Sequence, residues 1–135
     1  MYIIKKEFKL CCSHTLNNEK LSKTKNVELF GKCNENHGHN YKVILCFKSK
    51  ELDPSTGMII NFDEIKKVFK KYIDDVFDHK NLNTLYYFNN IIPTAENMAE
   101  LFYDIIKKNL SDLYAVEIYE TDGASAIYVE DKNED

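Results

Sequence analysis

The stretch HGHNYKVILCF, residues 37–47, places a repeated histidine directly before a run of alternating apolar residues. Alternation with a period of two is the pattern of a half-buried β-strand, and it predicts a strand over residues 39–48. One face of this strand carries its bulky apolar side chains, Tyr41, Val43, Leu45 and Phe47. Side chains two apart in an extended chain point the same way, so His37 and His39 can reach one metal ion.

A second strand is predicted over residues 2–12, where charged and apolar residues alternate in the same way. His14 follows this strand and shares the parity of its apolar positions, Phe8, Leu10 and Cys12. If the two strands pair, His14 lies beside His37 and His39, and three neutral imidazoles with one open position form a catalytic zinc arrangement. Two plainer interpretations stay open at this point. The histidines can be ordinary surface or core residues, or they can form a structural zinc site that Cys33 closes as the fourth ligand.

The rest of the chain predicts two helices and two short strands. Apolar residues recur at three- and four-residue spacing over residues 63–77 and 95–110, which is typical of amphipathic helices. Residues 114–121 and 125–130 are predicted to be strands joined by a tight turn. The order ββααββ predicts an α+β fold, a four-stranded antiparallel sheet with both helices on one face. Residues 15–36 show little periodicity and are predicted to be a long loop, for which a functional role is favoured over a plain connection of a long β-hairpin.

Composition and charge limit the class of protein. The 135 residues, of which 44% are hydrophobic, suffice for one folded domain, predicted over residues 1–135. A net charge of −4 and a pI of about 5.6 argue against nucleic-acid binding, which needs a basic face. The chain has neither an apolar run of about 20 residues nor a signal segment, so we expect a cytoplasmic protein that makes no membrane contact. Its cysteines are then expected to be reduced, and its charged end, residues 130–135, to fray.

Three further positions have both a chemical interpretation and a plainer structural one. Cys33 shortly precedes His37, and a thiol near positive charge is a usable base or nucleophile, although it can equally be an inert small residue. Asp78 next to His79 is an acid–base pair or a polar helix end, where histidine suits the helix dipole. Glu120 shares the parity of the apolar positions on its strand, so it is either an inward ligand anchor or a strand end that twists into solvent.

Six short motifs occur in order along the chain, and together they are far more specific than any one of them. They are Leu29-Phe30-Gly31-Lys32-Cys33, His37-Gly38-His39-Asn40-Tyr41-Lys42-Val43, Asp53-Pro54-x-x-Gly57-Met58, Asp78-His79-Lys80-Asn81-Leu82, Pro93-Thr94-x-Glu96-Asn97 and Tyr119-Glu120-Thr121. The chain resembles the 6-pyruvoyl-tetrahydropterin synthase and 6-carboxy-tetrahydropterin synthase family over about residues 3–129. This resemblance implies a tunnelling fold, in which trimers form a barrel and two trimers stack into a homohexamer with active sites between subunits.

The resemblance also implies a role for each candidate residue. The roles are zinc ligand (His14, His37 and His39), catalytic thiol with relay partners from a neighbouring subunit (Cys33 with Asp78 and His79), and pterin binding (Glu120, Thr94 and Thr121). The implied substrate is 7,8-dihydroneopterin triphosphate. Zinc would act as a Lewis acid toward the side-chain hydroxyls while the thiolate takes a proton from the adjacent carbon.

The two branches of this family differ in their product. One eliminates triphosphate to give 6-pyruvoyl-tetrahydropterin for biopterin, and the other cleaves the side chain to 6-carboxy-tetrahydropterin, releasing acetaldehyde, for queuosine and other deazapurines. Three residues separate Cys33 from His37, a spacing typical of the carboxy branch, whereas the pyruvoyl branch typically has five. We therefore predict the 6-carboxy product. The 6-pyruvoyl product is the alternative, which the residues around Cys33 and Asp78 favour.

Two further alternatives remain. Glu35 lies near the thiol, and a third variant of the family uses a glutamate there to make 6-hydroxymethyl-dihydropterin for folate. A non-catalytic binding module stabilised by zinc is the alternative from another class of protein, and such a module would unfold when its metal is removed.

Overall fold

The computed structural model describes residues 1–131, so the part of the predicted fraying end at residues 132–135 lies outside the described residues. Within this range the strands are β1 (Tyr2–His14), β2 (His37–Ser49), β3 (Lys80–Asn81), β4 (Leu113–Thr121) and β5 (Ala124–Val129). They form one sheet in the order β3-β1-β2-β4-β5. β3 runs parallel to β1 and the other neighbours are antiparallel, so the sheet is mixed.

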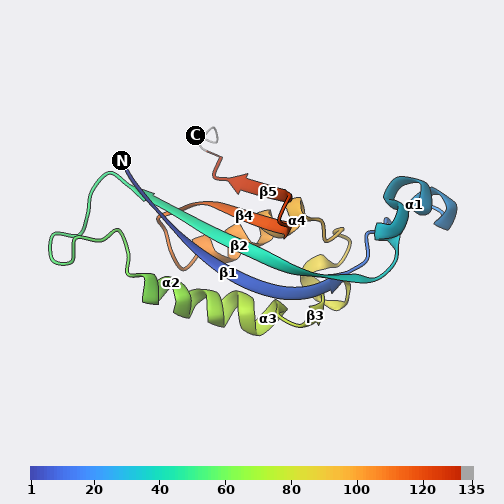
Figure 1. Ribbon diagram of the computed structural model, residues 1–135, viewed down its shortest axis with the longest axis horizontal. Coiled ribbons are helices and arrows are strands. Elements are labelled where there is room, and N and C mark those ends of the chain that lie inside the picture. The colour runs from blue at the N-terminus through green and yellow to red at the C-terminus, as the bar shows by residue number, and fades with distance from the viewer. Residues whose placement is uncertain (132–135) are drawn as a thin grey trace.

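The helices are α1 (Lys23–Phe30), α2 (Phe62–Phe69), α3 (Asp75–Phe77) and α4 (Ala95–Lys107). A π-helical turn over Lys70–Asp74 joins α2 to α3, so the helix predicted over residues 63–77 is present with one irregular turn. Figure 1 shows α2 and α4 lying along the sheet, whereas α1 projects from the far end of β1 and β2 as a separate arm. No helix within residues 1–131 combines the length and apolar character that a membrane crossing requires.

One face of the sheet packs against α2, α3 and α4 to form the core. The strand residues in this core are Leu10, Cys12, Tyr41, Val43, Leu45, Phe47, Leu113, Val116 and Ile118. All but Leu113 have the parity that the alternating pattern predicts, and Leu113 departs from it where the register with β2 shifts between Cys46 and Phe47. Facing them are Ile65 and Phe69 from α2 and Phe102 from α4, all buried. Complete burial of one such side chain contributes about 1.5–3 kcal/mol. This burial therefore determines which side chains of β1 and β2 point into the core.

Two elements depart from the predicted order. The prediction of a four-stranded antiparallel sheet is wrong, because a fifth strand, β3, pairs with β1 in parallel. β3 is too short to carry a pattern. The backbone N–H of His79 donates to the carbonyl of Cys11 at 2.6 Å just before it, and tertiary pairing of this kind leaves no sequence signal. The loop predicted over residues 15–36 contains α1, capped by Ser22, and a 3₁₀ turn over Gly31–Asn34.

The four cysteines all lie within the described residues, and none is paired. Cys12 and Cys46 are buried, and burial raises the pKa of both thiols, that of Cys12 to about 12. Sγ of Cys12 donates to the carbonyl of Phe77 at 3.1 Å, which ties β1 to α3. These two thiols therefore act as packing residues, whereas Cys33 is exposed.

Candidate metal centre

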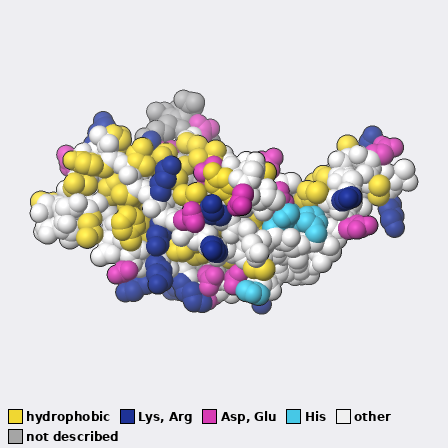
Figure 2. Space-filling model, in the orientation of Figure 1, with side chains coloured by type: hydrophobic (Ala, Val, Ile, Leu, Met, Phe, Trp, Pro, Cys, Tyr) yellow, Lys and Arg dark blue, Asp and Glu magenta, His cyan; other side chains and the backbone are white. Residues whose placement is uncertain are grey.

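The paired ends of β1 and β2 bring three histidines together on the face that carries the core. The strand register places His14 opposite His37 and Cys12 opposite His39. Nε2 of His14 lies 2.9 Å from Nε2 of His37, and the ring centroids of His14 and His39 are 5.1 Å apart. Figure 2 shows histidine side chains gathered where the body of the molecule meets the α1 arm. The structure thus assembles the three histidines that the strand parity predicted.

Backbone carbonyls determine the tautomers of two of these imidazoles. Nδ1 of His14 lies 2.7 Å from the carbonyl oxygen of Pro93, and Nδ1 of His37 lies 2.7 Å from that of Glu35. A carbonyl can only accept, so each Nδ1 carries the hydrogen and each neutral ring presents a lone pair at Nε2. Two such Nε2 atoms at 2.9 Å cannot hydrogen-bond to each other. A cation between them satisfies both lone pairs.

Glu120, near the end of β4, brings a carboxylate into the same group. Its Oε1 lies 3.3 Å from Nε2 of His14 and 3.1 Å from Nε2 of His39. Nε2 of His39 is buried and has no hydrogen-bond partner within residues 1–131, so the short approach of Glu120 is a contact without hydrogen-bond geometry. The four ligand atoms of His14, His37, His39 and Glu120 all lie within 4.8 Å of one another. The edges of a tetrahedral zinc site with these donors measure about 3.3–3.5 Å, so the donor set fits a divalent metal ion.

Burial keeps two of the imidazoles neutral. Desolvation lowers the pKa of His14 and of His39, and this outweighs the opposing effect of the nearby Glu120 carboxylate. The neutral imidazole is the form that binds a metal ion. The hydroxyl of Tyr41 lies 3.3 Å from Nδ1 of His14, and burial raises the pKa of this phenol, so it stays protonated beneath the site.

Cys33 lies outside this group of ligand atoms. Its side chain is exposed on the 3₁₀ turn that precedes β2. Among the described residues, the group that can hold a metal ion contains Glu120 as its fourth member and does not contain Cys33. The interpretation in which Cys33 closes a structural zinc site is therefore not supported.

Asp78 and His79 form a bonded pair at the edge of β1. Oδ1 of Asp78 accepts from the backbone N–H of Cys11 at 2.9 Å, and its Oδ2 lies 2.7 Å from Nδ1 of His79. Burial raises the pKa of Asp78, but these hydrogen bonds outweigh it and hold the pKa below its usual value. His79 has a left-handed backbone with φ of 59°, a conformation that costs about 1–3 kcal/mol in residues other than glycine and that clusters at functional sites.

The Asp78–His79 pair opens onto a cavity of about 510 Å³ that Thr121 also lines. The side chains of Lys9 and Lys42, which line it too, lie on the face of the sheet that the helices do not cover, because their parity is opposite to that of the core residues. The histidines and Glu120 have the core parity. Within one chain the sheet therefore lies between the metal group and this cavity.

Thr94, the remaining candidate, caps α4, and its Oγ1 accepts from the backbone N–H of Asn97 at 3.2 Å. The carbonyl of the preceding residue, Pro93, orients His14. Sequence reasoning missed Pro93 and Tyr41 as neighbours of the metal group. Tyr41 shares the parity of His39, so strand parity could have predicted its place near the metal group. A backbone carbonyl, such as that of Pro93, leaves no signal in the sequence.

Comparison with known proteins places this fold and site among pterin enzymes. The family model described as 6-pyruvoyl tetrahydropterin synthase matches residues 3–131. The 6-pyruvoyl tetrahydrobiopterin synthase of Homo sapiens is 39% identical over 130 residues, covering 93% of this chain and 89% of the relative, and that of Dictyostelium discoideum is 36% identical, covering 86% and 87%. The structure of Caenorhabditis elegans 6-pyruvoyl tetrahydropterin synthase has a TM-score of 0.90 at 33% identity and 96% coverage of both chains. The resemblance seen in the sequence motifs is thus confirmed, and the chain belongs to the 6-pyruvoyl tetrahydropterin synthase family of lyase-type enzymes.

Proposed function

We propose that this chain is a zinc-dependent 6-pyruvoyl-tetrahydropterin synthase, which converts 7,8-dihydroneopterin triphosphate to 6-pyruvoyl-tetrahydropterin and triphosphate. The observation that carries the proposal is the identity to curated relatives of that name, 39% and 36%, along most of both chains. The spacing between Cys33 and His37 predicts the 6-carboxy product instead. The comparisons favour the pyruvoyl alternative, because these relatives bear the pyruvoyl name.

In this proposal the Nε2 atoms of His14, His37 and His39 hold the zinc ion. When bound, zinc supplies a Lewis acid that makes the carbon next to a hydroxyl of the substrate more acidic. Glu120 binds the amino edge of the pterin through charge-assisted hydrogen bonds. Its carboxylate lies 3.3 Å from Nε2 of His14 and 3.1 Å from Nε2 of His39, so the proposed pterin anchor lies beside the metal group. Thr94 and Thr121 are proposed to flank the pterin pocket.

Cys33 is the proposed base, and Asp78 with His79 adjusts its protonation. The side chain of the substrate is oxidised to a dione while the dihydropterin ring is reduced, so loss of triphosphate needs no external oxidant. Within one chain, the Asp78–His79 pair lies at the β1 edge and opens onto the face of the sheet opposite to the metal group. This separation supports an active site built from two chains, and we propose the homohexamer that the family resemblance implies.

The test is to incubate the purified, zinc-loaded protein with 7,8-dihydroneopterin triphosphate and identify the products by mass spectrometry. We expect 6-pyruvoyl-tetrahydropterin and triphosphate. Cys33→Ala should abolish turnover while zinc content stays unchanged, and Lys32→Ala on the same turn is the matched control that keeps both. Full activity of Cys33→Ala would contradict the role of the thiol.

Each remaining alternative gives a different result in the same experiment. A 6-carboxy product with acetaldehyde would mean that the Cys33–His37 spacing is the better guide. A 6-hydroxymethyl product would point to Glu35. Absence of turnover together with unfolding on metal removal would favour the binding module.

A further inference from the structure

The segment that follows His14 is held by hydrogen bonds on both sides. The backbone N–H of Thr15 donates to Oδ1 of Asn83 at 2.7 Å, and Nδ2 of Asn83 donates back to the carbonyl of Thr15 at 2.9 Å. The backbone N–H of Leu16 donates to the carbonyl of Cys33 at 2.8 Å. The strand that ends at His14 is thereby tied directly to the turn that carries the Cys33 thiol.

Asn34, the residue after Cys33, closes the second half of this connection. Its Nδ2 donates to the carbonyl of Leu16 at 3.0 Å and to Oδ1 of Asn17 at 2.9 Å. Both backbone polar groups of Leu16 are therefore bonded to two consecutive residues of the turn. One of these bonds uses a side-chain amide where a β-bridge would use a backbone amide. We call this arrangement, formed by Leu16, Asn17, Cys33 and Asn34, the amide clamp.

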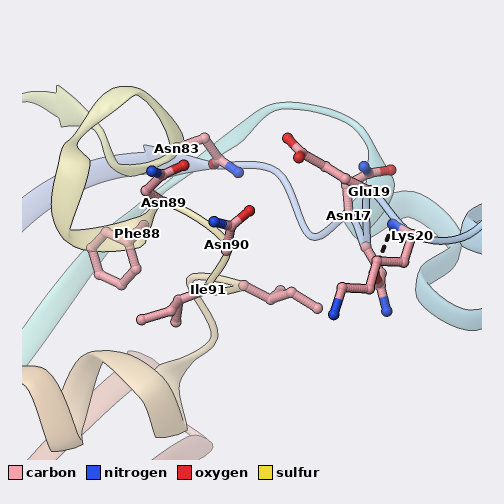
Figure 3. Close-up of a pocket in the computed structure, with 10 residues that line it drawn as sticks. Asn17, Glu19, Lys20, Asn83, Phe88, Asn89, Asn90 and Ile91 are labelled. Carbon is pink, nitrogen blue, oxygen red and sulfur yellow. Dashed lines mark hydrogen bonds between the residues drawn. The ribbon is translucent and has the colours of Figure 1, made fainter.

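A second loop supports the amide clamp from the other side. Figure 3 shows Asn17 and Glu19 facing Asn83, Asn89 and Asn90 across a small pocket, whose volume is about 150 Å³. Asn83 holds Thr15 from this side while the turn holds Leu16 from the other. Displacement of this segment therefore breaks hydrogen bonds on at least one side, which makes it a rigid reference point two residues from His14.

We infer that Asn34 is a positioning residue for the Cys33 thiol and thereby a determinant of the product. The amide clamp fixes Cys33 relative to His14. The residues between Cys33 and His37 therefore only span a distance that the hydrogen bonds of the clamp already determine. This explains how a chain with the short spacing aligns with relatives named 6-pyruvoyl synthases. A base displaced by about 1 Å can lose about 100-fold in rate. We infer that proton removal from a different carbon of the substrate side chain then competes. The inference rests on the proposed function.

The experiment compares Asn34→Asp and Asn34→Ala with the wild-type enzyme. Asn34→Asp keeps the shape of the side chain but lacks both N–H donors, and Asn34→Ala removes the amide without adding charge. The matched control is Asn109→Ala, because within residues 1–131 the side chain of Asn109, just after α4, bonds only to the carbonyl of Ile105. Four quantities are measured: kcat and KM, the ratio of 6-carboxy to 6-pyruvoyl product, the zinc content, and the alkylation rate of Cys33 by iodoacetamide in a Cys11→Ser background.

We expect both Asn34 variants to lower kcat by about 100-fold with KM and zinc content unchanged. The 6-carboxy fraction and the alkylation rate of Cys33 should both rise, and Asn109→Ala should behave as wild type. Wild-type kcat, products and alkylation in both Asn34 variants would overturn the inference, and so would loss of zinc and fold together with activity. A lower kcat with unchanged products would overturn the part that concerns the product. If wild type makes no 6-pyruvoyl-tetrahydropterin, the proposed function fails, and the alkylation rates still decide whether the clamp positions the thiol.

Discussion

At the scale of single residues, backbone carbonyls orient two of the three histidines of the metal group. His14 and His37 each donate Nδ1–H to a carbonyl, from Pro93 and from Glu35, and this leaves their Nε2 lone pairs facing one another. Strand parity predicts the three histidines because alternation is a property of side chains. The carbonyls that orient two of them belong to residues distant in sequence or placed in a turn, so no residue pattern announces them.

The first prediction concerns His37, one of the two half-buried members of the three. We expect His37→Ala to weaken zinc binding by at least about 100-fold, because it removes one of few ligands, and loss of a residue that only orients a ligand already costs about 10–100-fold. Competition with a chromophoric chelator measures the affinity. His79→Ala is the control and should bind zinc as wild type does, since His79 lies outside the group of ligand atoms. Equal zinc affinity in His37→Ala and wild type would contradict the assignment.

The second prediction concerns the pH dependence that Asp78 contributes to stability. Burial raises the pKa of this carboxyl, but the hydrogen bonds from the Cys11 N–H and from His79 leave it below its ordinary value of 3.8. A carboxyl with a lower pKa in the folded state stabilises fully above its unfolded-state pKa, and this contribution is lost as the pH falls through the folded-state pKa. Asp78→Asn should therefore lower the free energy of unfolding by about 1 kcal/mol at neutral pH. That difference from wild type should shrink below pH 3.8.

Urea unfolding of both proteins at several pH values measures this difference. Asp112→Asn is the control, because the side chain of Asp112 is exposed and forms no hydrogen bond or ion pair within residues 1–131. A difference between Asp78→Asn and wild type that stays constant as the carboxyl titrates would show that the charge of Asp78 has no part in it.

At the scale of elements, long periodic segments are predictable and short ones are not. The predicted strands and helices match β1, β2, β4, β5, the α2–α3 segment and α4 within a few residues at each end. Each of these buries an apolar face, so burial and sequence pattern have the same cause. β3 depends on bonds to Cys11, and α1 depends on the side chain of Asn26, so neither has an apolar pattern that could reveal it.

The third prediction concerns Asn26, which holds the α1 arm together. It is 2% exposed, its Oδ1 accepts from the N–H of Asn18 at 2.7 Å, and its Nδ2 donates to the carbonyls of Asn18, Leu21 and Ser22. Asn26→Ala removes these four bonds and leaves the N–H of Asn18 and the carbonyl of Leu21 without them, and we expect a local destabilisation of about 1–3 kcal/mol. Hydrogen exchange should speed up over residues 18–30 and stay unchanged in the core strands.

The matched control for Asn26→Ala is Lys25→Ala on the same helix. Lys25 forms an exposed ion pair with Glu28, and exposed pairs contribute at most about 1 kcal/mol. If Asn26→Ala exchanges no faster than this control, the arm is held by something other than Asn26. If exchange instead speeds up throughout the core, the arm and the sheet unfold as one unit.

At the scale of the whole molecule, the single chain leaves both a sheet edge and a candidate site incomplete. Within residues 1–131, β5 pairs only with β4, and its Ile127 and Val129 are 54% and 49% exposed. An open edge with exposed apolar side chains is normally covered by another chain or protected in some other way. The metal group lies on the helix-covered face of the sheet, whereas the Asp78–His79 pair lies at the β1 edge and opens onto a cavity on the other face. Association of chains can cover the edge and bring one chain's histidines to another chain's Asp78–His79 pair.

This arrangement allows a test by complementation, which is the fourth prediction. His37→Ala lacks a metal ligand and His79→Ala lacks a relay residue, so each variant alone should be nearly inactive. If every site takes its histidines from one chain and its Asp78–His79 pair from another, mixed assemblies contain intact sites. With random mixing of equal amounts, one chain in two supplies an intact metal group and one in two an intact pair, so roughly a quarter of the wild-type activity should return.

The two variants carry different affinity tags and are co-expressed, and tandem purification isolates the mixed assemblies. Activity per mole of protein is then compared with that of each variant alone and with wild type purified in the same way. If the mixed assemblies show only the average of the two inactive variants, His79 and the metal group either serve the same chain or do not share a reaction. Recovery toward a quarter of wild type places them on different chains, because no single chain in the mixture carries both His37 and His79.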